Sequence, residues 1–210
     1  MTDTTTTPEP FTVTLPYTSA ILAGAYAVAL HTSKDDVTPI ICTVRVSPRY
    51  FMATDRYSVG RFEHTPEGDD GEAVMVPRAA MEWLTKQSPK ALGKVQRDSM
   101  ADVRVTFTSE SVTLEEGEQT LAVQRFAPVA GTFPPVGRLV DGAEAATDGA
   151  AVNLNPRFME RFTKGAARVL EPHGALRMEF TKTANPDKPG PVIFSFGAFK
   201  GLLQPNLILR

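Results

Sequence analysis

The order of elements expected along the chain repeats, and this repeat limits the possible folds more than any other feature of the sequence. Alternating apolar residues predict strands, as in 11–16, and apolar residues at helical spacing predict helices at 17–30, 78–87 and 156–170. Each expected helix follows one expected strand and precedes three more. A strand, a helix and three strands, occurring three times, predict an α+β fold built from equivalent units.

The third unit begins after a low-complexity segment, "VDGAEAATDGA". Its expected first strand is "AVNLN", and Asn155 followed by Pro156 is a typical helix start, with an N-cap side chain before a proline at the first helical position. Four segments are predicted: a disordered lead-in at 1–10, a two-unit domain at 11–140, a linker at 141–149 and one further unit at 150–210.

Composition excludes several classes of protein. A hydrophobic content of 42% and a charged content of 22% are ordinary for a globular protein, and no apolar run is long enough to span a membrane. The first ten residues lack the basic and apolar parts of a secretory signal. Cys42 is the only cysteine, so an intrachain disulfide is excluded, and its apolar context "PIICTV" is typical of a small buried hydrophobe. These features fit a cytoplasmic protein.

The segment "YFMATDRYSVG" raises the question of catalysis, because a carboxylate, Asp55, follows a buried strand. A general base or a metal site would need partners at plausible spacing. The three histidines, His31, His64 and His173, share no motif with it, and no phosphate-binding glycine loop or nucleophile elbow is present. We therefore expect no enzyme, metal or cofactor. Asp55 is expected to cap a turn by accepting hydrogen bonds from nearby backbone amides.

Five motifs in sequence order resemble those of the bacterial sliding clamp, the processivity ring of replicative DNA polymerases. "YFMATDRYSVG" resembles the clamp stretch that leads from a strand into Ala-Thr-Asp-Gly-(His/Tyr)-Arg-Leu. "AVMVPRAAMEWL" resembles a Val-Pro-Arg helix entry, and "FAPVAGTFPPVGRLV" a Gly-x-Phe-Pro-Asp-Tyr closing segment. "VNLNPRFMERF" resembles the Asn-Pro-x-Tyr-Leu helix start of the last domain, and "LLQPNLI" the terminal Val-Met-Pro-Met-Arg-Leu strand.

The resemblance implies a shortened clamp similar to the DNA polymerase III beta subunit, of cellular or phage origin. Its fold would consist of repeated β-α-β-β-β units, with antiparallel sheets outside and helices inside. It would be a homo-oligomeric, non-enzymatic DNA-binding protein of DNA replication, with double-stranded DNA as a sequence-independent partner. A replicative polymerase and a clamp loader would dock through linear peptides, and no cofactor is implied.

The sequence departs from the family pattern in two ways. Arg56 stands where the family usually has glycine, Ser58 where it has arginine, and Asn206 and Leu207 replace Met-Arg. The family chain also has six units, whereas this chain has three. The substitutions at positions 56, 58, 206 and 207 leave the peptide preference open.

The resemblance also implies an apolar peptide-binding groove, formed by a strand end, the C-terminal strand and the loop between the last two domains. Carried over residue by residue, the groove would include Ile41, Thr54, Arg56, Tyr57, Ser58, Val59, Leu202, Gln204, Pro205 and Asn206.

Residue spacing points separately to a surface that could bind DNA. Arg157, Arg161, Lys164 and Arg168 are spaced by four, three and four positions, so they share one face of the expected helix. Arg78, Lys86 and Lys90 add cations around the second helix. Such cations would contact phosphates without reading base sequence. A solvated helix face is the alternative explanation of the same spacing.

The odd number of units predicts an oligomer. A single third unit would leave its apolar face uncovered, and a second chain would cover it across a two-fold axis. The residues expected at this interface are Phe158, Phe162, Val192, Phe194, Phe196 and Leu203. A dimer or a tetrameric ring would follow. The alternative function is that of an adaptor or decoy, which binds partner peptides on the same fold without closing a ring.

Overall fold

The computed structural model describes residues 11–66, 71–87, 102–145, 152–170, 174–182 and 189–205. The first unit contains β1 (Val13–Pro16), α1 (Ser19–Ala29), the short 3₁₀ helix η1 (Pro39–Cys42), β2 (Thr43–Val46), β3 (Tyr50–Thr54) and β4 (Ser58–Glu63). The second contains β5 (Val74–Pro77), α2 (Arg78–Lys86), β6 (Val103–Phe107), β7 (Ser111–Glu116) and β8 (Gln119–Arg125). After these come α3 (Gly137–Asp141), α4 (Pro156–Val169), β9 (Arg177–Phe180), β10 (Val192–Phe196) and β11 (Phe199–Leu203).

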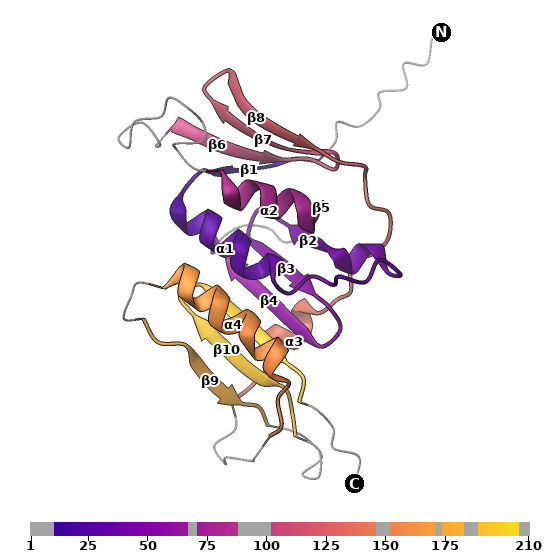
Figure 1. The fold of residues 1–210 in the computed structure, drawn as a ribbon, viewed down its shortest axis with the longest axis vertical. Coiled ribbons are helices and arrows are strands. Elements are labelled where there is room, and N and C mark those ends of the chain that lie inside the picture. The colour runs from indigo at the N-terminus through magenta and orange to yellow at the C-terminus, as the bar shows by residue number, and fades with distance from the viewer. Residues whose placement is uncertain are drawn as a thin grey trace.

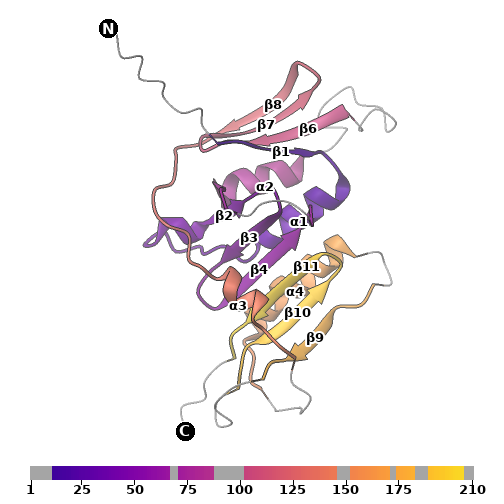
Figure 2. The same ribbon diagram turned by 180° about the vertical axis from the view of Figure 1, so that it is seen from behind.

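The strands form two antiparallel sheets, and the three long helices lie on one face of the molecule (Figures 1 and 2). One sheet has the order β1-β6-β7-β8, and the other has the order β5-β2-β3-β4-β11-β10-β9. The α+β class with antiparallel sheets is therefore confirmed. The first strand of each of the first two units pairs in the sheet of the other, since β1 joins β6 and β5 joins β2.

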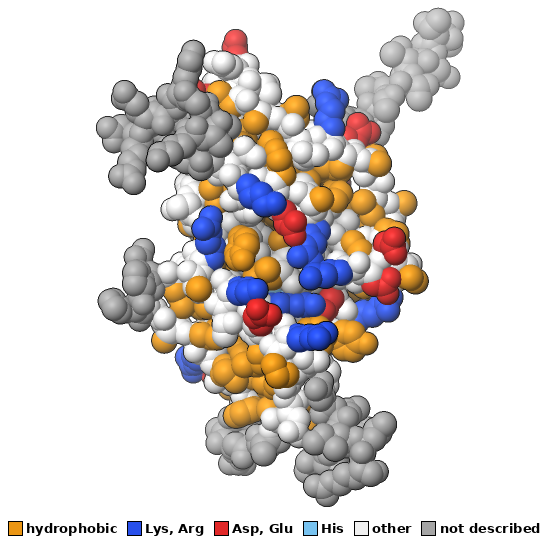
Figure 3. All heavy atoms as spheres, viewed as in Figure 1, with side chains coloured by type: hydrophobic (Ala, Val, Ile, Leu, Met, Phe, Trp, Pro, Cys, Tyr) orange, Lys and Arg blue, Asp and Glu red, His pale blue; other side chains and the backbone are white. Residues whose placement is uncertain are grey.

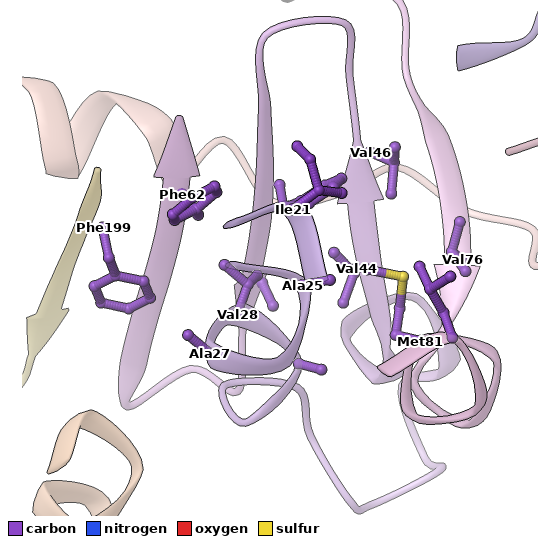
Figure 4. Close-up of a cluster of buried hydrophobic side chains, with 14 of the residues drawn as sticks. Ile21, Ala25, Ala27, Val28, Val44, Val46, Phe62, Val76, Met81 and Phe199 are labelled. Carbon is purple, nitrogen blue, oxygen red and sulfur yellow. The ribbon is translucent and has the colours of Figure 1, made fainter. Parts of the chain in front are cut away.

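Helix α1 is apolar on nearly all sides because it lies between its two neighbours and a sheet. Thr18 caps it by accepting a hydrogen bond from the Ile21 amide, 3.2 Å away. Ala25, Ala27 and Val28 are fully buried. Figure 4 shows this apolar side of the helix over the strands that carry Val44 and Phe62. Small residues allow close approach here: a Cβ added at Gly24 would lie 2.3 Å from the Phe62 ring.

The third unit differs from its prediction at its beginning. Residues 152–155 form no strand, so the expected strand "AVNLN" is wrong over that part, and residue 151 lies outside the described residues. The predicted helix start is confirmed, since the Asn155 side chain accepts a hydrogen bond from the Arg157 amide at 3.0 Å. The sheet topology gives the physical reason for the missing strand. The first strands of the other two units, β1 and β5, each pair in the sheet of a neighbouring unit, and residues 152–155 have no such pairing.

The apolar face of the third unit is covered by its own chain, which corrects the predicted interface. Strand β11 pairs along β4, with Leu202 opposite Val59, and α4 packs beside α1. As a result Phe162, Val192, Phe194, Phe196 and Leu203 are buried, and Phe158 is partly buried. A second chain is not needed to cover this face.

Two features concern the segments between units. In the expected linker, Asp141 is still part of α3, and Ala145 forms an isolated bridge with Thr181. The expected lead-in at 1–10 lies outside the described residues. Among the described residues, no helix is long and apolar enough to cross a membrane.

Candidate functional site

The turn between β3 and β4 is organised by one carboxylate. Asp55 Oδ1 accepts hydrogen bonds from the backbone amides of Tyr57 (3.1 Å) and Ser58 (2.8 Å). The predicted role of Asp55 as a turn cap is therefore confirmed. Arg56, at the tip, has a φ of 79°, and no other non-glycine residue in the described part of the chain has a positive φ. Glycine adopts this conformation most easily, so Arg56 holds a backbone conformation that side chains disfavour.

Arg161 has a role that its spacing did not predict. Its Nη1 forms an ion pair with Asp55 Oδ2 and also donates to Ser58 Oγ at 3.0 Å. Its guanidinium lies over the Phe158 ring, 4.7 Å from the centroid. The Arg161 side chain is 20% exposed and that of Asp55 is 6% exposed. Arg161 thus connects α4 to the β3–β4 turn, and we exclude it from the cations available for DNA.

Ser58 and His31 complete this buried network. The Ser58 hydroxyl donates to Asp55 Oδ1 at 3.0 Å, so the hydrogen of the 3.1 Å contact with His31 lies on His31 Nδ1. Burial, assisted by the charge of Arg161, lowers the pKa of His31 to about 3. Ser58 is 1% exposed and its proton is directed to the carboxylate, so the three side chains form a structural network and not a nucleophile activated by a base.

A groove of about 470 Å³ lies where β4 meets β11, between the turn and α3. Figure 2 shows α3 on the face of the sheet opposite the long helices. Two apolar side chains on the groove are unusually exposed, Tyr57 at 59% and Leu139 at 60%. Tyr57 stacks on Phe158 of α4 at a ring-centroid distance of 5.4 Å, and its carbonyl accepts from the Gln204 amide at 2.9 Å. The walls of the groove are therefore held by both α4 and β11.

The structure brings half of the expected groove residues together. Arg56, Tyr57, Val59, Leu202 and Gln204 line the groove. The other described ones are buried and do not line it: Ile41, Thr54, Ser58 and Pro205. Thr54 supports the turn instead, by donating to the Ser58 carbonyl at 2.9 Å. Asn206 lies outside the described residues.

Sequence reasoning assigned no residue to the wall opposite the turn, although the resemblance included the loop between the last two domains in the groove. The residues that line this wall come from α3, the segment after it, and the positions just after β9 and just before β10: Arg138, Leu139, Gly142, Ala143, Glu144, Thr181, Lys182 and Pro191. The signal was present, because the motif "GTFPPVGRLV" leads into α3. Its residues were matched to the family but were not carried over to the groove.

The opposite face of the molecule carries a hollow of about 570 Å³ between the three long helices. Its lining includes cations from two helices: Arg78, Lys86, Lys164 and Arg168. Figure 3 shows blue side chains gathered across this face. Two of these cations have partners on their own helix, since Arg78 bonds Glu82 at 2.6 Å and Lys164 bonds Glu160 at 2.8 Å.

We define the basic helix face by its exposed or partly exposed cations: Arg78, Lys86, Arg157, Lys164 and Arg168. With Glu82 and Glu160, this face carries five positive and two negative charges, a net charge of +3 in a chain of net charge −2. Lys86, Arg157 and Arg168 form no ion pair with the described residues. Lys90 lies outside the described residues. Among the described residues, no group of three or more His, Cys, Asp or Glu side chains could hold a metal ion.

Comparison with known proteins identifies the fold. No protein-family model and no curated protein sequence matches the chain. Solved structures do: the sliding clamp (DNA polymerase III subunit beta) of Bartonella birtlesii matches with a TM-score of 0.54 at 13% identity, over 97% of this chain and 68% of that one. The sliding clamp of Caulobacter crescentus gives 0.56 at 14%, over 97% and 67%. That of Bacillus subtilis gives 0.51 at 12%, over 97% and 66%. The chain therefore has the sliding-clamp fold.

Proposed function

We propose, from the sliding-clamp fold, that the chain is a non-enzymatic clamp that surrounds duplex DNA as a homo-oligomeric ring and docks partner peptides, such as those of a replicative polymerase and a clamp loader. The observation that carries the proposal is the position of the cations: four of them line the hollow between the long helices of a chain whose net charge is negative. Flexible cations that contact phosphates bind DNA without reading its sequence and allow sliding.

The DNA contact is tested through its salt dependence. Binding of a labelled duplex is followed by fluorescence anisotropy at several salt concentrations for the wild type and for Lys86→Glu/Arg168→Glu. Each lost phosphate contact lowers the slope of log K against log salt by about 1, so the double variant loses about 2. Lys200→Glu is the matched control, because Lys200 on β11 points to the same side as Leu202, away from the helices. Equal slopes in all three proteins would contradict the proposal.

The groove supports peptide docking because apolar side chains line it and stay exposed. Tyr57→Glu and Leu139→Glu should each weaken binding of a labelled clamp-binding peptide at least about tenfold, since central apolar anchors dominate such interfaces. Both side chains are more than half exposed, so the fold tolerates the change. Val37→Glu is the control, because Val37 is 80% exposed and does not line the groove. Leu202 is unsuitable for this test because it is 4% exposed.

Ring closure separates the clamp from an adaptor or decoy. A closed ring stays on circular DNA at high salt and leaves it when the circle is cut, whereas a protein held only by charge leaves both. Retention that depends on circularity supports the clamp. Peptide binding without such retention would favour the adaptor.

A further inference from the structure

The groove has the same pair of residue types on two opposite walls. On one wall, the β3–β4 turn presents Arg56 followed by Tyr57. On the other, α3 presents Arg138 followed by Leu139. Tyr57 and Leu139 are the apolar side chains that are more than half exposed there. Each side chain that could hold an apolar peptide residue therefore has an arginine next to it in the chain.

Arg56 forms no ion pair with the described residues, although a carboxylate precedes it in the sequence. Asp55 is occupied by Arg161 of α4, and its side chain is only 6% exposed. Nη2 of Arg56 donates to Thr38 Oγ1 at 2.5 Å, and this hydroxyl carries no charge. A guanidinium has five N–H donors, so most of those of Arg56 are available to a ligand.

Arg138 has equivalent surroundings on α3. Asp141, three positions later in the same helix, pairs with Arg61 of β4 at 2.6 Å. Arg138 itself forms no ion pair with the residues that the structure describes. On both walls, the carboxylate nearest in the sequence is thus taken by an arginine from another element.

The charges of the groove add up to a positive site. Its charged lining residues are Arg56, Arg138, Lys182 and Glu144, which are three cations and one anion, so the net charge is +2. Lys182 and Glu144 pair with each other at 3.5 Å, and the excess charge therefore lies on the two arginines. A guanidinium can bind a carboxylate through two parallel hydrogen bonds, which a neutral side chain cannot reproduce.

We propose that the groove selects a peptide in which acidic residues flank an apolar anchor. The anchor packs between Tyr57 and Leu139, and the acidic residues pair with Arg56 and Arg138. The positive φ of Arg56 agrees with this role, because backbone strain of this kind is typical of ligand-binding sites. The proposal rests on the peptide docking of the proposed function and adds the chemistry of the peptide.

A nucleic acid also carries negative charge, but the groove suits it less well. Single strands bind mainly by stacking their bases on aromatic side chains. Tyr57 is the one aromatic residue in the described lining, and Phe158 stacks on it at a centroid distance of 5.4 Å. The other large apolar lining residues, Val59, Leu139 and Leu202, are aliphatic. These side chains favour the apolar anchor of a peptide.

Two fluorescein-labelled peptides of equal length test the selection. Both contain the same Leu-Phe pair, which is flanked by aspartates in one peptide and by asparagines in the other. Fluorescence anisotropy at low salt gives the Kd of each peptide for the full chain. Two partly exposed ion pairs, worth about threefold each, should make the aspartate peptide bind about tenfold more tightly. The preference should decrease at high salt, because exposed charges are screened.

Variants of the two arginines assign the selection to residues. Glycine adopts a φ of 79° without strain, so Arg56→Gly spares the turn. Arg56→Gly and Arg138→Gln should each lower the ratio of the two Kd values about threefold, and the double variant should bring it close to 1. Lys200→Gln is the matched control and should leave the ratio unchanged. Lys200 is a cation on the same face of β11 as Leu202, but it does not line the groove.

Equal affinities of the two peptides for the wild type would overturn the proposal and leave the apolar docking of the proposed function standing. A preference that survives in the double variant, or that falls as far in Lys200→Gln, would overturn it as well. Failure of both peptides to bind would refute docking at the groove altogether. A short oligothymidylate that displaces the aspartate peptide at a lower concentration than the unlabelled peptide does would assign the groove to nucleic acid instead.

Discussion

The two carboxylate oxygens of Asp55 have different partners. Oδ1 accepts three hydrogen bonds from the turn that contains Asp55, and Oδ2 forms an ion pair with Arg161 of another unit. We expect Asp55→Asn to lower the free energy of unfolding by about 3 kcal/mol, because Arg161 would keep its partly buried charge without a carboxylate. Urea denaturation at pH 7 measures the change. Glu160→Gln is the control, since it removes an exposed ion pair on the same helix and should leave the unfolding midpoint unchanged. Equal urea midpoints in the two variants would show that the ion pair between Asp55 and Arg161 contributes nothing to the free energy of unfolding.

His31 makes the stability depend on pH. Its pKa is about 3 in the folded chain and 6.5 in the unfolded chain, so only the unfolded state gains a proton between these values. The contribution of His31 is complete above pH 6.5 and is lost as the pH falls toward 3, by about 2 kcal/mol between pH 6.5 and pH 5. Denaturation at pH 7 and pH 5 should show a smaller difference for His31→Gln, which keeps a donor near Ser58, than for the wild type. A wild-type-like pH dependence in the variant would assign the effect to other groups.

These residues also show how far a sequence can predict a site. The role of Asp55 was predictable because its partners, Tyr57 and Ser58, lie within three positions of it. The role of Arg161 was not, because helical spacing reports only which side chains share a face. It does not report that one of them turns toward a carboxylate in another unit.

At the scale of elements, the contact between α1 and α4 depends on small residues. A Cβ added at Gly165 would lie 3.1 Å from Ala27 Cβ and 3.2 Å from the Phe196 ring. Gly165→Leu should therefore lower the free energy of unfolding by about 2 kcal/mol, because the added side chain forces the helices apart. Thermal denaturation followed by circular dichroism measures this. Ala167→Leu, at an exposed position of the same helix, should change stability by less than about 0.5 kcal/mol, and a similar loss there would show that the loss at Gly165 does not come from the contact between the helices.

The helices and most strands could be predicted because their patterns are local. The predicted helices at 17–30, 78–87 and 156–170 contain α1, α2 and α4. The prediction of a strand at 151–155 is wrong over the described residues 152–155, and the reason does not lie in the sequence of that segment. A strand forms only where a neighbour offers an edge, and the third unit has no second unit of its own to provide one.

At the scale of the whole molecule, one apolar core joins all three units. Its buried residues come from both sheets and from the third unit, including Phe107, Val44 and Phe194. We expect a single cooperative unfolding transition, since no unit has a core that is closed by itself. Fluorescence of Trp83, the only tryptophan, should therefore have the same urea midpoint as far-UV circular dichroism and as exchange protection of the β10 and β11 amides. Separate midpoints would mean that the third unit unfolds independently.

The order of elements predicted the class of fold but not the pairing between units. The residues of β11 do not by themselves indicate that this strand pairs with β4. The apolar face of the third unit was for that reason predicted to pack against a second chain. The burial of Phe196 and Leu203 inside their own chain is a property of the continuous seven-stranded sheet.

The pairing of strands that lie far apart in the sequence has a consequence for synthesis on the ribosome. Val13, near the start of the chain, pairs with Phe107, and Phe62 pairs with Phe199, near its end. The four-stranded sheet can therefore be completed once β8 has been made, whereas the seven-stranded sheet waits for β9, β10 and β11, which are made much later than β4. Such long-range pairing slows folding and leaves strand edges open to other molecules in the meantime. The edge of β4 is therefore the one that stays without its partner strand for longest during synthesis, until β11 has been made.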